Sequence, residues 1–369
     1  MPCVRHPDPL HAARPAHHFL LPPMPEALIS LPEGFAHRMV DWQRQHGRQS
    51  LPWQNTQDPY RVWLSEIMLQ QTQVTTVLDY FPRFLGRFPD VTTLAAAPQD
   101  DVLALWSGLG YYSRARNLHK CAQEVMSRFG GAFPPRAEDL QTLPGIGRST
   151  AAAIAAFCFH ERAAILDGNV KRVLTRVWGY GQDLAATKNE RALWTLAQQL
   201  LPEQAADMPR YTQALMDLGA TVCLPRKVQC GVCPVSDLCQ AKTQGEPLAY
   251  PVKTRKLKRS SATLWLLWAV NTQGQVWLQK RPDKGIWAGL FSLPVFDSEG
   301  DLLAAWGAGQ DPRYIQPWKH VLTHRDLHLH PVQMTGEVQR SPDCEGQWVD
   351  AAAWPGMGLP APIRVLLAG

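Results

Sequence analysis

Residues 143–151 read Leu-Pro-Gly-Ile-Gly-Arg-Ser-Thr-Ala and stand between two stretches with helical spacing of apolar residues. Gly145 and Gly147 permit a tight hairpin, and the backbone amides of such a hairpin can approach an anion at the start of the following helix. A phosphate of a nucleic-acid backbone suits that geometry. A lone Gly-x-Gly is also common in ordinary turns between helices, so the hairpin gains its weight from the residues that follow.

The segment after the hairpin leads to a carboxylate. Residues 151–156 are small and permit close helix packing, and residues 165–172 read Ile-Leu-Asp-Gly-Asn-Val-Lys-Arg. Asp167 could serve only to cap a helix that begins near Val170, although capping and catalysis can coexist. The hairpin with Asp167 downstream resembles the helix-hairpin-helix glycosylase superfamily, and this resemblance implies that Asp167 occupies the catalytic position.

Helical periodicity extends far beyond the hairpin. From about residue 31 to residue 240, apolar residues recur at helical spacing between short Pro and Gly breaks, so this half is predicted to be all-α. The clearest predicted helical segments are 60–78, 100–105, 117–128, 149–159, 189–200 and 210–220.

The composition changes after residue 245. Prolines and a basic run give residues 246–260 the composition of a linker. Strand patterns follow at 263–270, 275–279, 328–332 and 346–349, so an α+β domain is expected at 261–369. The all-α helix-hairpin-helix domain is assigned to 26–245, and 1–25 is assigned to a disordered tail or to a misassigned start before Met24.

Length and composition limit the classes of function. A chain of 369 residues with 45% hydrophobic content has room for two cores, and a net charge of +5 is compatible with nucleic acid without requiring it. No apolar run reaches the roughly 18 residues that a membrane span needs. The N-terminus also lacks an apolar segment of signal-peptide length, so a cytoplasmic protein without a membrane partner is expected.

A second carboxylate lies in an apolar helical phrase. Residues 63–74 read Trp-Leu-Ser-Glu-Ile-Met-Leu-Gln-Gln-Thr-Gln-Val. Partial burial would raise the pKa of Glu66 and favour a protonated general acid, whereas the plain alternative is a solvated helix residue. The phrase closely resembles the adenine-specific mismatch glycosylase family, MutY. The resemblance implies that Glu66 protonates adenine and that Asp167 stabilises the oxocarbenium ion or bonds covalently to it.

The residue after Arg148 bears on strand cleavage. The related endonuclease III family carries a lysine there as its amine nucleophile, whereas this chain has Ser149. A monofunctional adenine glycosylase is therefore expected, although Lys171 could trap an aldehyde incidentally. Two alternatives remain: a pyrimidine glycosylase with lyase activity and a non-catalytic DNA-binding scaffold.

The resemblance also implies the substrate and the setting. The expected partner is double-stranded DNA with adenine opposite 8-oxoguanine or guanine. The protein is expected to be a monomer, bacterial and associated with the nucleoid.

Enzymes that act on a base extrude it from the stack and fill the gap with planar or wedge side chains. Gln70, Gln71 and Tyr111 are candidates for that role, and the resemblance places Tyr111 beside the damaged guanine and Gln71 in the gap. By the same resemblance, Gln54 and Gln213 are candidates for the adenine pocket.

Three further residues stand in the glycine-rich stretch 108–117. Arg114 and Arg116 are candidates for phosphate contacts, with solvated surface arginines as the alternative. Tyr112 is expected in the core.

Four of the eight cysteines stand within 17 residues: Cys223, Cys230, Cys233 and Cys239. Their intervals are compact enough to wrap one metal centre with four thiolates. Zinc is the rival, but zinc ribbons usually pair two Cys-x-x-Cys knuckles and this segment has one. With the resemblance included, the prediction is a [4Fe-4S] cluster.

Residues from about 261 onward resemble the Nudix-like domain of the same family, which recognises 8-oxoguanine opposite the adenine. The resemblance rests on Gln-Lys-Arg-Pro at 279–282 and on residues 285–294. No glutamate-rich metal-binding helix follows Pro294, so pyrophosphate hydrolysis is not expected.

The family's lesion-checking loop has a Phe-Ser-His pattern, and the matching stretch here is Leu322-Thr323-His324. The histidine is kept and the hydroxyl becomes that of Thr323, while Leu322 loses stacking area. A metal site formed by His320, His324, His328 and His330 is the alternative. No cysteine lies close to them, and the loop already accounts for His324.

Overall fold

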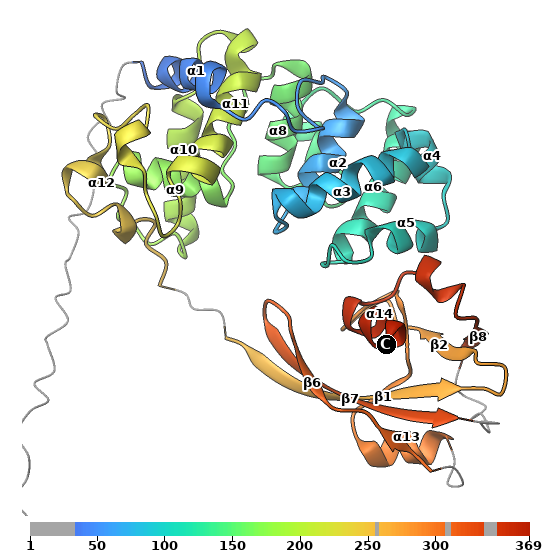
Figure 1. The fold of residues 1–369 in the computed structure, drawn as a ribbon. Coiled ribbons are helices and arrows are strands. Elements are labelled where there is room, and N and C mark those ends of the chain that lie inside the picture. Colours follow the sequence, from blue (N-terminus) through green and yellow to red (C-terminus); the bar gives the residue numbers. More distant parts are fainter. Residues whose placement is uncertain (1–33, 255–257, 307–310, 336–344) are drawn as a thin grey trace, which may run out of the picture.

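The computed structural model describes residues 34–254, 258–306, 311–335 and 345–369 (Figure 1). The tail predicted at 1–25 lies outside these residues. A helical part comes first, and a part built on a mixed sheet follows (Figure 1). The predicted fold class, an all-α domain followed by an α+β domain, is confirmed.

The helical part consists of α-helices joined by short turns and four short helical turns named η. In chain order these elements are α1 (Phe35–His46), α2 (Pro59–Leu69), α3 (Val74–Arg87), α4 (Val91–Ala96), α5 (Gln99–Trp106), α6 (Ser113–Phe129), α7 (Ala137–Leu140), α8 (Arg148–Phe159), α9 (Gly168–Val177), α10 (Thr187–Gln199), η1 (Ala205–Asp207), α11 (Met208–Asp217), η2 (Leu218–Val222), η3 (Cys230–Val232), α12 (Gln240–Thr243) and η4 (Pro247–Ala249).

Helix α8 joins two hydrophobic cores. Ala151 and Ala155 belong to the core that surrounds Trp63. Ala152, Ala153 and Ala156 belong to a second core, with residues of α1, α9 and α11. Because α8 is apolar and small on every side, neighbouring helices can cover it all round.

One predicted helix is in fact two. The segment 60–78 was predicted as a single helix, but α2 ends at Leu69 and α3 starts at Val74. Gln71, between them, has a left-handed backbone with φ of 57°. The prediction was wrong because Arg114, which is distant in sequence, donates to the carbonyls of Ile67, Met68 and Gln70. A continued helix would use those carbonyls for its own hydrogen bonds.

The second part is built on a mixed sheet with one long parallel pair at its centre. Its elements are β1 (Ser260–Val270), β2 (Val276–Lys280), β3 (Phe291–Ser292), β4 (Val295–Phe296), α13 (Glu299–Trp306), β5 (Arg313–Tyr314), β6 (Trp318–Val321), β7 (Arg325–Thr335), β8 (Gln347–Val349), η5 (Trp354–Gly356) and α14 (Ala361–Ala368). Strands β1 and β7 run parallel in register from Ser260 opposite Arg325 to Val270 opposite Thr335.

The two faces of this sheet belong to different cores. Leu266 and Leu329 lie in the core that also contains Trp63 and Trp106 of the helical part. Leu267 and Val332, on the opposite face, pack in a separate core with α13. The alternation of β-strand side chains therefore ties one face of the sheet to the helical part.

Polar contacts also join the two parts. Ser107 donates a hydrogen bond of 2.8 Å to the carbonyl of Leu359, and the Lys280 ammonium lies 2.7 Å from a carboxylate oxygen of Asp100. None of the helices in the described part of the chain is long and apolar enough to cross a membrane.

The packing of α8 gives a first prediction. Replacing Ala155 by Leu overfills a fully buried site and lowers the free energy of unfolding by about 1–3 kcal/mol. Replacing the exposed Ala192 of α10 by Leu is the matched control and leaves it within about 0.5 kcal/mol. Chemical denaturation measures both variants, and equal stability of the two would show that α8 is not tightly packed.

Candidate active site

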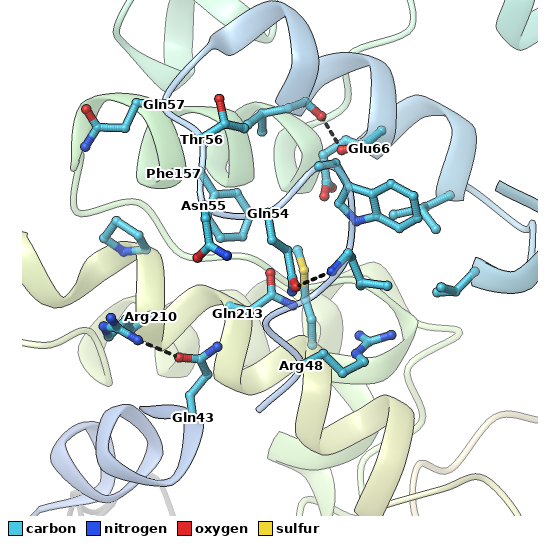
Figure 2. A pocket seen from close by; sticks show the side chains of 18 of the residues that line it. Gln43, Arg48, Gln54, Asn55, Thr56, Gln57, Glu66, Phe157, Arg210 and Gln213 are labelled. Atoms are coloured by element: carbon cyan, nitrogen blue, oxygen red, sulfur yellow. Dashed lines mark hydrogen bonds between the residues drawn. The ribbon is translucent and has the colours of Figure 1, made fainter. Parts of the chain in front are cut away.

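A cavity of about 480 Å³ opens between α2, the loop that precedes it and α11 (Figure 2). Polar side chains from these three segments line it, and Glu66, Gln54 and Gln213 are among them. Gln213, distant in sequence, is thus brought to the same cavity as Gln54 and Glu66, whereas Asp167 is not one of its lining residues. Asp58 caps the start of α2 by accepting a hydrogen bond of 2.9 Å from the Tyr60 amide.

Glu66 lies on the α2 wall of the cavity, between the buried Ser65 and Ile67. Burial, and to a smaller extent the negative charge of Asp167, together raise the pKa of its carboxyl to about 8. A carboxyl with such a pKa keeps its proton near neutral pH and can donate it to a bound group.

Asp167 is the N-cap of α9. Its Oδ1 accepts a hydrogen bond of 2.8 Å from the Val170 amide, so the capping role is confirmed. Burial raises the pKa of Asp167, while the amides of Val170 and Asn169 act in the opposite direction. These donors offset part of the effect of burial, although the pKa of Asp167 stays above its usual range.

The Ser149 hydroxyl, in the first turn of α8, accepts a hydrogen bond of 3.1 Å from the Leu166 amide. This bond ties the helix after the hairpin to the residue before Asp167. The Lys171 ammonium lies 2.5 Å from Glu190 Oε1. The one lysine predicted near the carboxylates is therefore engaged in an ion pair.

A buried network that the sequence did not reveal supports the cavity floor. Asp217 is fully buried, and its carboxylate accepts hydrogen bonds from the Arg48 Nε at 2.7 Å and from the Arg48 backbone N–H at 2.9 Å. The Gln213 amide donates to the same carboxylate at 2.9 Å. The available signal was an acidic residue four positions after Gln213 on an apolar helix.

A second group of predicted residues meets beside the hairpin. Gln70, Gln71, Tyr111 and Gly145 line a cavity of about 250 Å³. Gln71 and Tyr111 have left-handed backbones, with φ of 57° and 47°. Such conformations cost energy in residues with side chains and concentrate at functional sites.

The hairpin forms as predicted, but its two glycines differ. Gly145 has φ of 78°, and a Cβ there would lie 2.8 Å from Cβ of Asn117. Gly147 has an ordinary φ of −84° and is the N-cap of α8, directly before the backbone N–H groups of the first turn of that helix. Gly145 therefore needs to be glycine for backbone reasons, whereas Gly147 does not.

Arg114 is not a phosphate contact. Its buried guanidinium donates to the carbonyls of Ile67, Met68 and Gln70 at 2.9, 2.9 and 2.6 Å, and to the carbonyl of Leu109 at 3.1 Å. It also fixes the turn that separates α2 from α3.

Arg116 is likewise engaged within the protein, because its Nη1 donates to the carbonyl of Ala288 at 2.6 Å. The predicted phosphate contact of Arg114 is wrong, because its guanidinium is buried among carbonyl acceptors, whereas that of the half-buried Arg116 stays a prediction.

A third cavity, of about 720 Å³, lies between the helical part and the sheet part. It is lined by Tyr111, Leu322, Thr323 and His324, and the hydroxyls of Tyr111 and Thr323 are hydrogen-bonded to each other. Tyr112 is not a pure core residue, since it also lines this cavity while its hydroxyl donates to the carbonyl of Leu359 at 3.2 Å.

The four clustered cysteines line one small cavity between α9 and η3. Arg176 Nη1 lies 3.3 Å from Cys223 Sγ and brings positive charge to the sulfurs. In the described ranges, no three or more His, Cys, Asp or Glu residues are placed to hold a metal ion. A single tetrahedral zinc would need its four sulfurs close together, whereas an iron-sulfur cube holds its cysteines further apart.

Two different protein families match the helical part and the sheet part of the chain. Residues 64–199 match the HhH-GPD superfamily of base excision DNA repair proteins, and residues 265–369 match the NUDIX domain.

An adenine DNA glycosylase of Buchnera aphidicola (subspecies Baizongia pistaciae) is 37% identical over 303 residues, which cover 81% of this chain and 85% of that protein. The adenine DNA glycosylase of Mus musculus is 46% identical over 217 residues, 56% of this chain and 41% of its own length. The structure of a thermostable thymine-DNA glycosylase has a TM-score of 0.50 at 28% identity, and covers 57% of this chain and 95% of that chain.

The raised pKa of Glu66 predicts how stability depends on pH. The folded state keeps the Glu66 proton up to about pH 8, whereas the unfolded state releases it near the ordinary carboxyl pKa of 4.5. Folding therefore binds a proton between these values, so this group's contribution to stability falls as pH rises through that window.

Replacing Glu66 by Gln removes this loss. At pH 8.5 the variant is expected to gain roughly 1–3 kcal/mol in free energy of unfolding relative to wild type, and little at pH 4.5, after allowance for solvent screening. The exposed Glu203 replaced by Gln is the control. A Glu66→Gln gain that does not change with pH, as determined by denaturation at both values, would contradict the raised pKa.

Proposed function

The chain belongs to the adenine DNA glycosylase family of base excision repair enzymes, and on this premise we propose that it removes adenine paired with 8-oxoguanine or guanine without cutting the strand. The observation that carries the proposal is the carboxyl of Glu66 on the wall of a cavity, with a pKa that burial and the charge of the hydrogen-bonded Asp167 carboxylate raise to about 8. A single acid and a single anion divide the work that adenine release requires.

Glu66 supplies the proton in this proposal. Adenine is a poor leaving group until a ring nitrogen such as N7 is protonated, and a carboxyl with a pKa of about 8 carries a proton under physiological conditions. Its pKa lies close to neutral pH, so the acid holds its proton yet still yields it readily.

Asp167 supplies the negative charge. As the base departs, the sugar becomes an oxocarbenium ion, and a nearby carboxylate stabilises it or bonds to it before water attacks. The amides at the start of α9 and the positive end of that helix favour the ionised form of Asp167. Because Glu66 is neutral when protonated, the two groups do not repel each other at the start of the reaction.

Gln54 and Gln213 give the cavity a donor beside an acceptor. Gln54 Oε1 accepts a hydrogen bond of 3.2 Å from the Leu51 amide, so its Nε2, which is buried and has no partner in the described structure, is left to donate. Gln213 Nε2 donates to Asp217, so its Oε1 is left to accept. Adenine presents an amine donor next to a ring-nitrogen acceptor, whereas guanine presents two acceptors on the corresponding edge.

The other predicted contacts receive roles in the same proposal. Gln70 and Gln71 fill the gap left by the extruded base, and Tyr111 lies beside the damaged guanine. All three line one cavity, where Gln71 and Tyr111 have left-handed backbones. The amides around Gly145 and Gly147 bind a backbone phosphate at the start of α8.

Hydrolysis rather than strand cleavage is supported by two contacts. The Ser149 hydroxyl is not an amine and accepts a hydrogen bond from the Leu166 amide, and the Lys171 ammonium is paired with Glu190.

Thr323 and His324 line the cavity between the two parts and read the base opposite adenine.

Cys223, Cys230, Cys233 and Cys239 would hold a [4Fe-4S] cluster in this proposal. The four-thiolate donor set and the nearby Arg176 suit an anionic cluster. With all four cysteines engaged, the group would brace the loop at 223–239 instead of binding substrate. Arg176 also binds the carbonyl of Leu224 at 2.7 Å and keeps that loop against α9.

Single-turnover base release tests the proposal. Duplexes carry adenine opposite 8-oxoguanine, adenine opposite guanine, or thymine glycol, and the Asp167→Asn variant is compared with wild type. We expect release of adenine from the first two, and a loss of at least about 1,000-fold in Asp167→Asn, since its carboxylate acts only in the transition state.

Asp350→Asn, which changes an exposed carboxylate far from the cavity, is the control and should retain wild-type rates. Activity confined to thymine glycol, or adenine release unaffected by Asp167→Asn, would rule out this function.

The amide arrangement predicts the effect of removing either glutamine. Gln54→Leu and Gln213→Leu should each slow adenine release about 10- to 100-fold, because a buried hydrogen bond to the base is worth roughly 1–3 kcal/mol. Gln57→Leu is the control, since this exposed glutamine lines the same cavity but bonds to His160. Equal effects of all three substitutions would contradict a specific donor and acceptor pair.

A further inference from the structure

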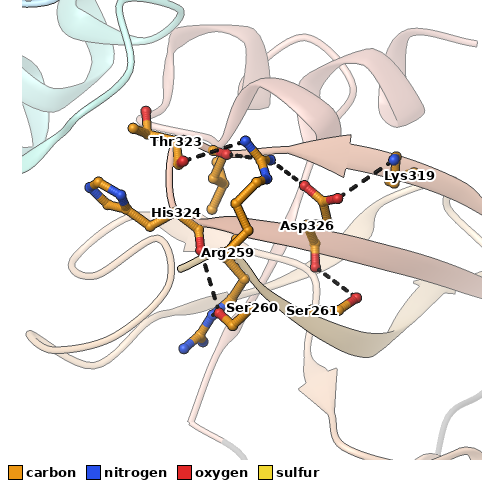
Figure 3. A network of polar contacts seen from close by, with 9 residues as sticks. Arg259, Ser260, Ser261, Lys319, Thr323, His324 and Asp326 are labelled. Atoms are coloured by element: carbon orange, nitrogen blue, oxygen red, sulfur yellow. Dashed lines mark hydrogen bonds and ion pairs between the residues drawn. The ribbon is translucent and has the colours of Figure 1, made fainter. Parts of the chain in front are cut away.

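The turn between β6 and β7 carries the two residues proposed to read the opposite base, and its backbone is bound in an unusual way (Figure 3). Leu322, Thr323 and His324 form the tip of this hairpin, between Val321 at the end of β6 and Arg325 at the start of β7. The Leu322 amide donates to the Arg325 carbonyl at 2.8 Å and closes the turn.

All three tip carbonyls accept hydrogen bonds from Arg259, which directly precedes β1, and from Ser260, the first residue of β1. Arg259 Nη2 donates to the Leu322 carbonyl at 3.0 Å, and its Nη1 lies 3.5 Å from the Thr323 carbonyl. The Ser260 amide donates to the His324 carbonyl at 3.0 Å.

The Arg259 guanidinium is itself held. It contacts Asp326 Oδ1, and the second oxygen of that carboxylate lies 3.5 Å from the Lys319 ammonium. The bond from Arg259 holds the pKa of Asp326 below its usual range, as expected for a carboxylate paired with a cation. The guanidinium therefore bridges a carboxylate on β7 and two carbonyls of the tip, in a planar fork geometry that lysine does not have.

Binding the carbonyls on one side leaves the side chains on the other. The His324 side chain points away from the Arg259 guanidinium in Figure 3. The Thr323 hydroxyl bonds to that of Tyr111, and both side chains line the cavity between the two parts of the molecule. The backbone contacts thus set where the hydroxyl and the imidazole stand relative to Tyr111.

We propose that Arg259 is a positioning residue for recognition of the base opposite adenine: by binding the carbonyls of Leu322 and Thr323, it holds Thr323 and His324 against the lesion cavity. This inference rests on the proposed function, because it assigns a cause to the discrimination that function requires. Guanine and its 8-oxo form differ at few atoms, so a side chain that distinguishes them must be held within a fraction of an ångström.

The chain's own departure from its family makes this support more important. Leu322 stands where an aromatic residue is expected and offers less stacking area to hold the tip against DNA. Backbone anchoring by Arg259 compensates for that loss by fixing the turn before DNA arrives. Because folding already orders the turn, binding to DNA does not incur that entropy cost again.

The test measures base release from duplexes with adenine opposite 8-oxoguanine and opposite guanine, and compares the ratio of the two second-order rate constants. In Arg259→Ala, the preference for 8-oxoguanine should fall about 10-fold, while the rate constant for adenine opposite guanine changes less than about 3-fold. Arg259→Lys keeps the charge but not the fork, so it should restore part of the preference.

Lys258→Ala is the matched control, because it removes one positive charge from the adjacent exposed position. It should leave the preference at the wild-type value. A folding defect in Arg259→Ala would appear in its melting temperature. Asp326→Asn then provides the same test, because it removes the ion pair with the Arg259 guanidinium and keeps the side-chain size.

The outcomes separate the two ideas. A wild-type enzyme without preference for 8-oxoguanine overturns the proposed lesion reading and this inference with it. A wild-type preference that survives in Arg259→Ala and Asp326→Asn, or a parallel loss of both rate constants, overturns the inference alone.

Discussion

The packing of α8 is the constraint on which the rest of this molecule depends. Its alanines let one helix enter two hydrophobic cores at once, and larger side chains there would push the cores apart. The hairpin that leads into α8 is fixed by the same packing. Through Ser149 and the Leu166 amide, α8 then sets the position of the residue next to Asp167.

The two carboxylates illustrate how one fold gives like groups unlike chemistry. Glu66 projects from the middle of a buried helix, where few donors can compensate for lost water, and its pKa rises to about 8. Asp167 sits at a helix start, where amides point toward it. The difference comes from their places on helices and not from the residue types, since both side chains are carboxylic acids.

The sheet part depends on the helical part as much as the reverse. One face of the sheet completes the core around Trp106, so the two parts share that core. The proposed reading of the opposite base depends on this docking, because it fixes the position of Thr323 relative to Tyr111. The hydroxyl contact from Tyr111 to Thr323 marks that fixed point.

By itself, the sequence determined the features that depend on neighbours along the chain. Spacing and backbone preference, which act over a few residues, determine the glycine hairpin, the cap at Asp167, the four clustered cysteines at 223–239 and the alternating strands. The tertiary structure alone decided the fate of the long polar side chains. Arg114, Asp217 and Arg259 find acceptors or donors 44, 169 and 63 positions away, as with Gln70, Arg48 and Leu322. A guanidinium or a buried carboxylate binds whichever partners the fold brings near. The local sequence does not determine which residues these partners are.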